Sequence, residues 1–238
     1  SLWLATRVRG IPPGSGFAVS THLSAAMNLA LGKISNQGET GAENSYTLAD
    51  KRRAALRSME AEGLLGIFGG FQDAFAFMGA FNYMRAESSK IIPEVTPLET
   101  VINKETQDEI TRRMVIFRSG LRRFKEAGPL LGNVAASYWL RKTTAMASWK
   151  RSRQNLHEQI ALLKGKEGDL SPQEVVTLYA KLEWQDWDNR VAIVGREELV
   201  KDSDGASNAF LEMEMRILKM EGLIDGWDST GIGGGGNI

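Results

Sequence analysis

The sequence predicts an all-α protein, with elongated or bundled helices between Gly/Pro-rich, irregular N- and C-terminal arms. Apolar residues recur at helical spacing through most of the 238 residues. Sustained alternation of apolar and polar residues, the pattern of half-buried strands, is missing from the sequence. Gly and Pro gather at the two ends, in "RVRGIPPGSGF" and "GWDSTGIGGGGNI". Residues 1–18 and 226–238 are therefore expected to lack regular structure in isolation and to become ordered only through contacts with neighbours.

Four regions follow from this pattern. Residues 1–48 are predicted to be an N-terminal arm with a short helix, and residues 49–92 an apolar helical region rich in Gly and Phe. Residues 93–224 are predicted to be a helical bundle or hairpin region, and residues 225–238 a Gly-rich C-terminal tail. A chain of this length with 42% hydrophobic residues can bury one good core or two small ones.

The stretch "EGLLGIFGGFQDAFAFMGAFNYMR", residues 62–85, is predicted to be a core or interface helix. Two adjacent faces are expected to make its contacts, an apolar seam of Leu64, Phe68, Phe71, Phe75 and Met78 and a small face of Gly66, Gly70 and Ala74. Small residues four apart let another backbone approach closely, which favours a neighbouring subunit as the partner. Conditional membrane contact and a standing membrane span remain the alternatives, although Asp73 at the midpoint argues against a passive span.

The next segments predict a connector and a helix. Residues 91–98 are expected to be extended, because Pro93 and Pro97 push the residues before them out of the α region. A stripe of apolar residues then predicts a helix that Gly128 and Pro129 should end; its members are Ile110, Met114, Phe117, Leu121 and Phe124. A basic face lies on the other side of this helix, formed by Arg118, Arg122 and Lys125.

Three further helices are predicted towards the C-terminus. The first runs from about residue 131 to 163 and ends at "KGKEGD". The second begins at "SPQE", where Ser171 and Glu174 can form a capping box around Pro172, and it continues to Gly195. The last runs from about Ser207 to Glu221 and needs cover on more than one side, because it carries two adjacent apolar seams. One seam is Phe210, Met213, Ile217 and Met220, and the next is Leu211, Met215 and Leu218.

The net charge of zero conceals blocks of opposite sign. Residues 110–165 carry 12 basic and 2 acidic residues, whereas residues 36–109 carry 7 basic and 12 acidic ones. Residues 166–238 carry 7 basic and 15 acidic residues. Such blocks can be neutralised inside one fold, between copies of the chain, or by nucleic acid, and only the last requires a foreign polyanion. The internal solution is favoured.

No catalytic, cofactor-binding or metal-binding residue is predicted, and the protein is not expected to be an enzyme. The chain has no Cys, and its only His residues, His22 and His157, are far apart in sequence, so it lacks the components of a thiol site, a triad or a zinc site. Glu183 and Asp186 form a carboxylate pair beside two Trp residues, but the sequence supplies no nucleophile near them. No signal peptide is visible.

One segment resembles a known family. "LSPQEVVTLYAKLEWQDWDN", about 20 of the 238 residues, resembles the capped second helix of needle and filament subunits from bacterial type III secretion systems. Pro172, Val176, Tyr179 and Leu182 stand in the comparable places. The resemblance implies a subunit that assembles through helical hairpins with apolar seams. A Gly- and Met-rich helical chain with loose ends is also typical of bacteriophage virion components that line a conduit.

The predicted function is therefore that of a structural subunit of a multi-protein assembly, working through helix packing and charge complementarity. The settings expected for it are a virion, as a phage portal, tail or ejection protein, or a secretion or filament apparatus. Its expected partners are copies of itself or other subunits. The alternative is a nucleic-acid-binding helical module that uses the basic block 110–165, where aromatic residues interleave with Arg and Lys; these are Phe117, Phe124, Tyr138, Trp139 and Trp149.

Overall fold

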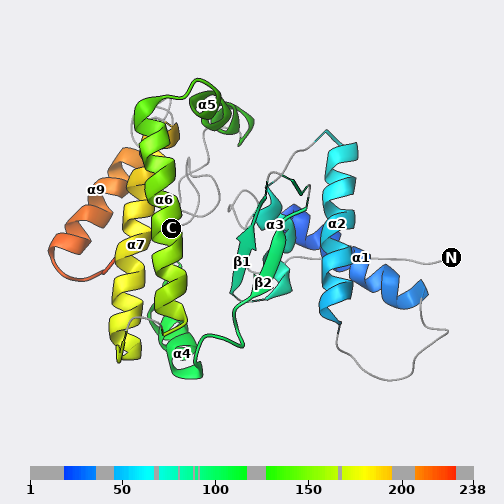
Figure 1. Cartoon of the computed structure of the whole chain (residues 1–238), viewed down its shortest axis with the longest axis horizontal. Coiled ribbons are helices and arrows are strands. Elements are labelled where there is room, and N and C mark those ends of the chain that lie inside the picture. Colours follow the sequence, from blue (N-terminus) through cyan, green and yellow to red (C-terminus); the bar gives the residue numbers. More distant parts are fainter. Residues whose placement is uncertain are drawn as a thin grey trace. The chain divides into compact units, whose positions relative to one another are not determined.

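A computed structural model (Figure 1) describes most of the chain, and α-helices account for 70% of the residues that it describes. The described residues are 19–35, 46–66, 70–79, 81–87, 89–90, 92–116, 127–165, 168–194 and 207–228. One small two-stranded sheet accompanies the helices within this part of the chain, so the predicted all-α class is confirmed. The arm at residues 1–18, and the tail from residue 229 on, lie outside the described residues.

The chain folds as two compact units that divide between Thr100 and Val101. The first unit contains α1 (Val19–Ser35), α2 (Leu48–Leu64), α3 (Phe71–Phe75), the 3₁₀ turn η1 (Ala76–Met78), β1 (Asn82–Arg85) and β2 (Glu94–Pro97). Its core gathers Ala55 of α2 with Ala74, Phe75 and Met78, all of them buried. α1 packs against α2, where Ser58 Oγ donates to the Thr21 carbonyl at 3.1 Å.

The predicted helix across residues 62–85 is wrong, because the chain breaks there into four elements. α2 ends at Leu64, and Gly66 follows with a φ of 73°, the left-handed conformation that closes a helix and that Gly adopts without strain. Gly70 is extended and precedes α3 as its N-cap residue, and β1 begins at Asn82. Gly66 and Gly70 were expected to share a packing face. Instead, Gly66 follows the end of α2 and Gly70 precedes the start of α3.

The hairpin of β1 and β2 was not expected from the sequence. The strands pair antiparallel from Asn82 opposite Pro97 to Arg85 opposite Glu94. The expectation of extended backbone near residues 91–98 is confirmed for Glu94–Pro97, which form a strand. Met84 and Val95 are partly buried against the cluster around Phe75, so the hairpin is held by that core.

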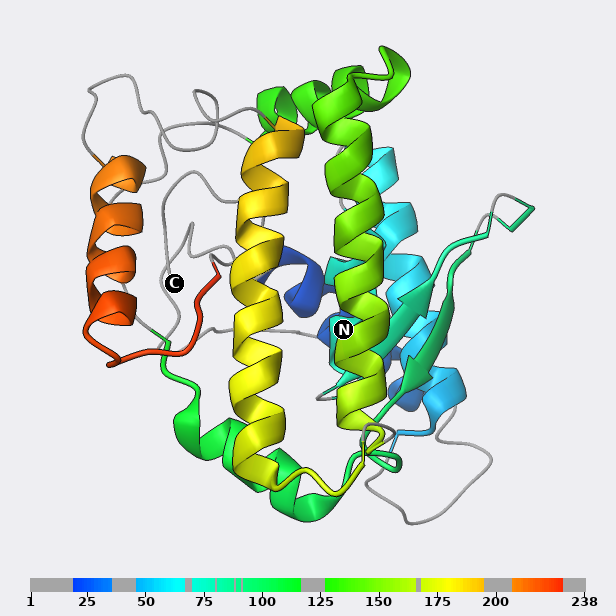
Figure 2. The same ribbon diagram turned by 60° about the vertical axis from the view of Figure 1, so that its left-hand side comes forward.

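The second unit is built on a hairpin of two long helices, α6 (Thr143–Leu163) and α7 (Pro172–Val194), which lie side by side in Figure 2. α4 (Lys104–Arg113) and α5 (Ala127–Trp139) both pack against α7. α9 (Ser207–Met220) adds its side chains to the main core of the unit. That core joins Trp184, Trp187, Val191 and Val194 of α7 to Met215 and Trp227.

Two predicted helices of this unit have different limits. α4 ends at Arg113, and Gly128 and Pro129 begin α5 rather than ending a helix. Pro fits there because the first turn of a helix needs no intrahelical N–H donor. The helix expected over residues 131–163 is divided into α5 and α6, and Arg141 between them has a left-handed φ of 52°.

The remaining helix ends agree with the predictions. α6 ends at Leu163, immediately before "KGKEGD", and Gly165 in that stretch has a φ of 65°. α7 ends at Val194, next to Gly195, and α9 covers the predicted range to within a residue.

Candidate assembly interface

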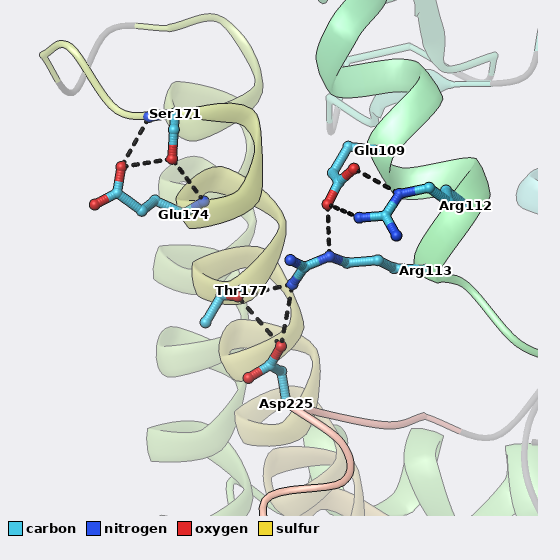
Figure 3. A network of polar contacts seen from close by, with 7 residues as sticks. All are labelled: Glu109, Arg112, Arg113, Ser171, Glu174, Thr177 and Asp225. Carbon is cyan, nitrogen blue, oxygen red and sulfur yellow. Dashed lines mark hydrogen bonds and ion pairs between the residues drawn. The ribbon is translucent and has the colours of Figure 1, made fainter.

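α7 is the scaffold of the second unit, and its start is fixed by the predicted capping box (Figure 3). The Ser171 backbone N–H donates to Glu174 Oε2 at 2.9 Å, and the Glu174 N–H donates to Ser171 Oγ at 3.3 Å. The Ser171 hydroxyl also donates to Glu174 Oε2 at 2.7 Å, and this bond, together with the one from the Ser171 N–H, holds the pKa of the Glu174 carboxyl below its ordinary value. Two otherwise unpaired donors at the helix start are thereby satisfied.

The interface between α6 and α7 is joined by buried polar side chains. Asn155 Nδ2 donates to Asp186 Oδ1 at 3.1 Å, and Gln159 Nε2 donates to Glu183 Oε1 at 3.0 Å. A third bond, from Arg151 Nε to Asn189 Oδ1, measures 3.0 Å. Because each amide needs its partner in a low-dielectric contact, these pairs fix the register of the two helices. Both carboxylates of the pair named from the sequence, Glu183 and Asp186, therefore accept hydrogen bonds from amides of the neighbouring helix.

Glu183 is an acid of this interface whose pKa is shifted by its surroundings. Burial raises the pKa of its carboxyl above the ordinary value; the Tyr179 hydroxyl, which donates to it, opposes that shift, and the nearby Asp228 and Asp186 add to it. Arg190 is the cation that acts against the rise. In the described part of the chain, no group of three or more His, Cys, Asp or Glu side chains is placed to hold a metal ion.

A short segment after α9, residues 221–228, docks on α7, and we call it the C-terminal strap. Gly226 lies so close to α7 that a Cβ there would stand 1.8 Å from the Ala180 carbonyl oxygen. Trp227 is buried, with its ring centroid 4.5 Å from that of Trp187. Asp228 Oδ2 accepts from Arg190 Nη2 at 2.8 Å. The strap is therefore held by a close backbone approach, a buried indole and an ion pair.

The strap is also tied to α4 through the network in Figure 3. Arg113 Nε donates to Oε1 of the buried Glu109 at 2.6 Å, and Arg112 Nε donates to Oε2 at 2.9 Å. The Arg113 guanidinium also reaches across to Thr177 Oγ1 at 3.3 Å and to Asp225 Oδ2 at 3.7 Å. Thr177 Oγ1 donates to the same Asp225 oxygen at 3.2 Å. One arginine of the predicted basic block thus meets an acid of the C-terminal block inside one unit.

α9 has two apolar faces, in agreement with its two predicted seams, and within the described residues one of these faces is covered. On the inner face, Met215 and Leu218 pack in the cluster that contains Trp184 and Trp187 of α7. Leu211 on the same face is also buried. Arg216 fixes the orientation of the helix, because its Nη2 is 2.7 Å from Glu212 Oε1 and 3.1 Å from Asp188 Oδ1 of α7.

The outer face of α9 consists of Met213, Ile217, Met220 and, just beyond the helix, Leu223. These side chains are 51%, 41%, 87% and 66% exposed. Met213, Ile217 and Met220 are spaced by four and three residues, so they form one continuous stripe. A stripe of large apolar side chains on a helix that is fixed from its inner side is a surface ready to pack against another helix.

The residues predicted for a helix interface do not share one face. Phe71, Ala74, Phe75 and Met78 do come together, but in the core of the first unit, where Phe75 is fully buried. Leu64 is 85% exposed at the end of α2. A Cβ at Gly66 would meet nothing within 4 Å, and one at Gly70 would meet the Gln72 side chain. Contact of these residues with a neighbouring subunit stays a prediction. The continuous helix on which that prediction was based does not form.

The other predicted sites divide between described and undescribed parts of the chain. Phe68 and the basic face of Arg118, Arg122 and Lys125 lie outside the described residues. Among the described helices, none is both long and apolar enough to cross a membrane.

The docking of the strap was not predicted from the sequence, because residues 225–238 were treated as a single tail. The signal was available: "DGWD" places one Trp and two Asp around a Gly, whereas the run dominated by small residues starts only after Asp228. Comparisons with protein families, with curated proteins and with solved structures find no match for this chain.

Proposed function

We propose that the protein is a structural subunit of a multi-protein assembly and that the outer face of α9 is one of its contact surfaces. The observation that carries the proposal is the continuous exposed stripe of Met213, Ile217 and Met220 on a helix whose other apolar face is already covered. Isolated exposed apolar residues are common on protein surfaces, but a contiguous set on one helix face marks an interaction site.

Energetics favour association through this face. Full burial of one large apolar side chain stabilises a contact by about 1.5–3 kcal/mol, and Met220 is still 87% exposed in the isolated chain. The helix is also held in place before any partner arrives, by Arg216 on its inner side and by the docked strap beyond its end. A pre-ordered surface loses little conformational entropy on binding.

The expected partner is a second copy of the chain or another subunit with an apolar helix face, packed helix against helix. In this proposal the protein acts by packing and charge complementarity, not by catalysis. A virion or a secretion filament is the setting that the sequence favours for such a subunit.

Sedimentation velocity over a range of protein concentrations tests the proposal. We expect the wild type to form species larger than a monomer, and the double variant Met213→Glu/Met220→Glu to lose them, because two carboxylates would be buried without partners in the contact. Both positions are at least half exposed, so the variant should keep its circular dichroism spectrum and thermal unfolding.

A matched control adds a carboxylate at an exposed polar position elsewhere in the same unit. Gln154→Glu on α6 meets this requirement, and we expect it to associate like the wild type. A wild type that stays monomeric at every concentration would refute the proposal, as would a folded double variant that associates as strongly as the wild type.

A further inference from the structure

The turn between α5 and α6, residues 138–142, is closed by a regular helix-terminating motif, and we call it the α5–α6 tip. The Lys142 N–H donates to the Ser137 carbonyl and the Arg141 N–H to the Tyr138 carbonyl, each at 3.1 Å. This pair of bonds is the Schellman arrangement, in which the residue after the helix takes a left-handed conformation. Arg141 occupies that position, with a φ of 52°.

Arginine is an unusual choice at this position. The other left-handed residues in the described part of the chain are Gly, and Gly66, Gly165 and Gly222 stand just after α2, α6 and α9. A side chain at a left-handed residue crowds its own backbone, which Gly avoids. Helix closure alone would therefore be served better by Gly. What Arg141 adds is a cation at the surface of the tip, with its guanidinium carbon 5.4 Å from the Tyr138 ring centroid.

The tip also exposes large apolar side chains next to this cation. Trp139 is 78% exposed and Leu140 is 70% exposed, and the Tyr138 ring stands edge-on to the Trp139 indole with centroids 6.1 Å apart. The backbone hydrogen bonds of the turn fix the chain where it passes from α5 to α6 (Figure 1). The tip is therefore a closed turn that exposes two large apolar side chains.

The sequence around the tip carries an excess of positive charge. Residues 127–157, which include α5 and the first two thirds of α6, carry five Lys and Arg residues and no Asp or Glu. Arg141 and Lys142 follow the apolar pair directly in the chain, and both are exposed. A surface of this composition attracts an anionic partner and can bury apolar side chains in it at the same time.

We propose that the α5–α6 tip binds the surface of an anionic lipid bilayer, with Trp139 and Leu140 inserted at the headgroup level and Arg141 and Lys142 paired with lipid phosphates. Trp at the interface and flanking basic residues are the combination that bilayer surfaces select. The exposed Trp139 indole can also stack on a base of single-stranded nucleic acid, whereas Leu140 beside it offers no ring and gains only by entering an apolar phase, which favours the bilayer. This contact goes beyond the proposed assembly function and uses a different surface.

Co-sedimentation with large vesicles tests the proposal, using vesicles of equal parts phosphatidylcholine and phosphatidylglycerol and vesicles of phosphatidylcholine alone. We expect the wild type to pellet with the anionic vesicles, and Trp139→Ser/Leu140→Ser to bind them about tenfold less or worse. The control Met114→Ser/Val115→Ser removes two apolar side chains of similar exposure, 63% and 78%, away from the tip, and it should bind like the wild type.

Arg141→Gly separates a binding role from a structural one. Gly is the better residue for a left-handed position, so this variant should unfold at a higher temperature than the wild type. If the tip binds anionic lipid, the same variant should bind the vesicles about fivefold more weakly, because a basic residue at the surface has been lost. A purely structural role for Arg141 predicts no loss of vesicle binding.

Each outcome of the vesicle experiment either supports or overturns the proposal. Tip-dependent pelleting with the anionic vesicles supports the proposal. Failure of the wild type to pellet overturns it, and so does pelleting that the tip and control variants reduce equally or not at all. Tip-dependent binding of a single-stranded oligonucleotide without vesicle binding would assign the surface to nucleic acid instead.

Discussion

Replacement of Gly226 by Ala should undo the docking of the C-terminal strap. The Cβ of an Ala at this position would stand 1.8 Å from the Ala180 carbonyl oxygen and 2.5 Å from its carbonyl carbon. Those atoms belong to the backbone of α7 and cannot rotate aside as a side chain could. The strap must therefore shift outward or leave α7.

The size of the effect follows from what the strap buries. A shift that relieves the contact while the strap stays in place costs about 1–3 kcal/mol, the usual range for overpacking. Complete release also exposes Trp227, which is 7% exposed in the docked state, and losing a buried Trp costs about 3–5 kcal/mol. The ion pair between Arg113 and Asp225 adds about 0–1 kcal/mol because both partners are partly exposed. We expect a loss of about 2–4 kcal/mol in unfolding free energy.

Urea denaturation followed by far-UV circular dichroism measures this loss. Gly132→Ala is the matched control, because Gly132 lies inside α5 and a Cβ there meets nothing within 4 Å. Helix propensity should make that control more stable than the wild type by up to about 1 kcal/mol. The two substitutions are chemically identical, yet opposite signs are expected. A Gly226→Ala protein as stable as the wild type, or more stable, would refute the docking geometry.

Three further predictions concern the helix ends and the α6–α7 interface. Ser171→Ala should lower the unfolding free energy by about 1 kcal/mol in urea denaturation, because the N-cap hydrogen bond of α7 is lost, whereas Ser171→Gly should cost less. Gly66→Ala should lower the melting temperature although a Cβ there meets no neighbour, since the residue is left-handed; an unchanged or raised melting temperature would contradict that conformation. Glu183 has a raised pKa in the folded state, so its stabilising contribution is complete below the ordinary glutamate pKa and is lost as the pH rises through the raised value. Glu183→Gln should therefore be more stable than the wild type at neutral pH and should flatten the pH dependence of urea denaturation, and an equally steep dependence in the variant would contradict the burial of this carboxyl.

Local chemistry explains why several elements could be predicted from the sequence. The start of α7 depends on Ser171 and Glu174, three residues apart, and the end of α6 on the nearby Gly165. The two seams of α9 were also readable, because their spacing alone shows that one side cannot cover both. Such features need no knowledge of which distant residues meet.

The failures have two physical origins. The prediction of one helix over residues 62–85 treated the segment as continuous, although Gly66 and Gly70 both disfavour a helix interior. The hydrogen bonds between α6 and α7 and the docking of the strap depend instead on pairs of residues far apart in the chain. Examples are Gln159 with Glu183 and Gly226 with Ala180. Which distant pairs meet is decided by tertiary packing, and no local pattern in one sequence specifies it.

Oxidation of individual methionines tests the central claim, association through the outer face of α9, most directly. Met220 is 87% exposed, Met213 is 51% exposed, and Met114, 63% exposed, serves as an internal reference on another element. Hydrogen peroxide converts exposed Met to the sulfoxide, which mass spectrometry of peptides can follow at each position. At concentrations where the protein associates, we predict that Met220 and Met213 react more slowly than Met114, and that dilution to the monomer removes this protection. Oxidation of Met220 and Met213 at the same rate in the associated and the diluted protein would contradict the claim.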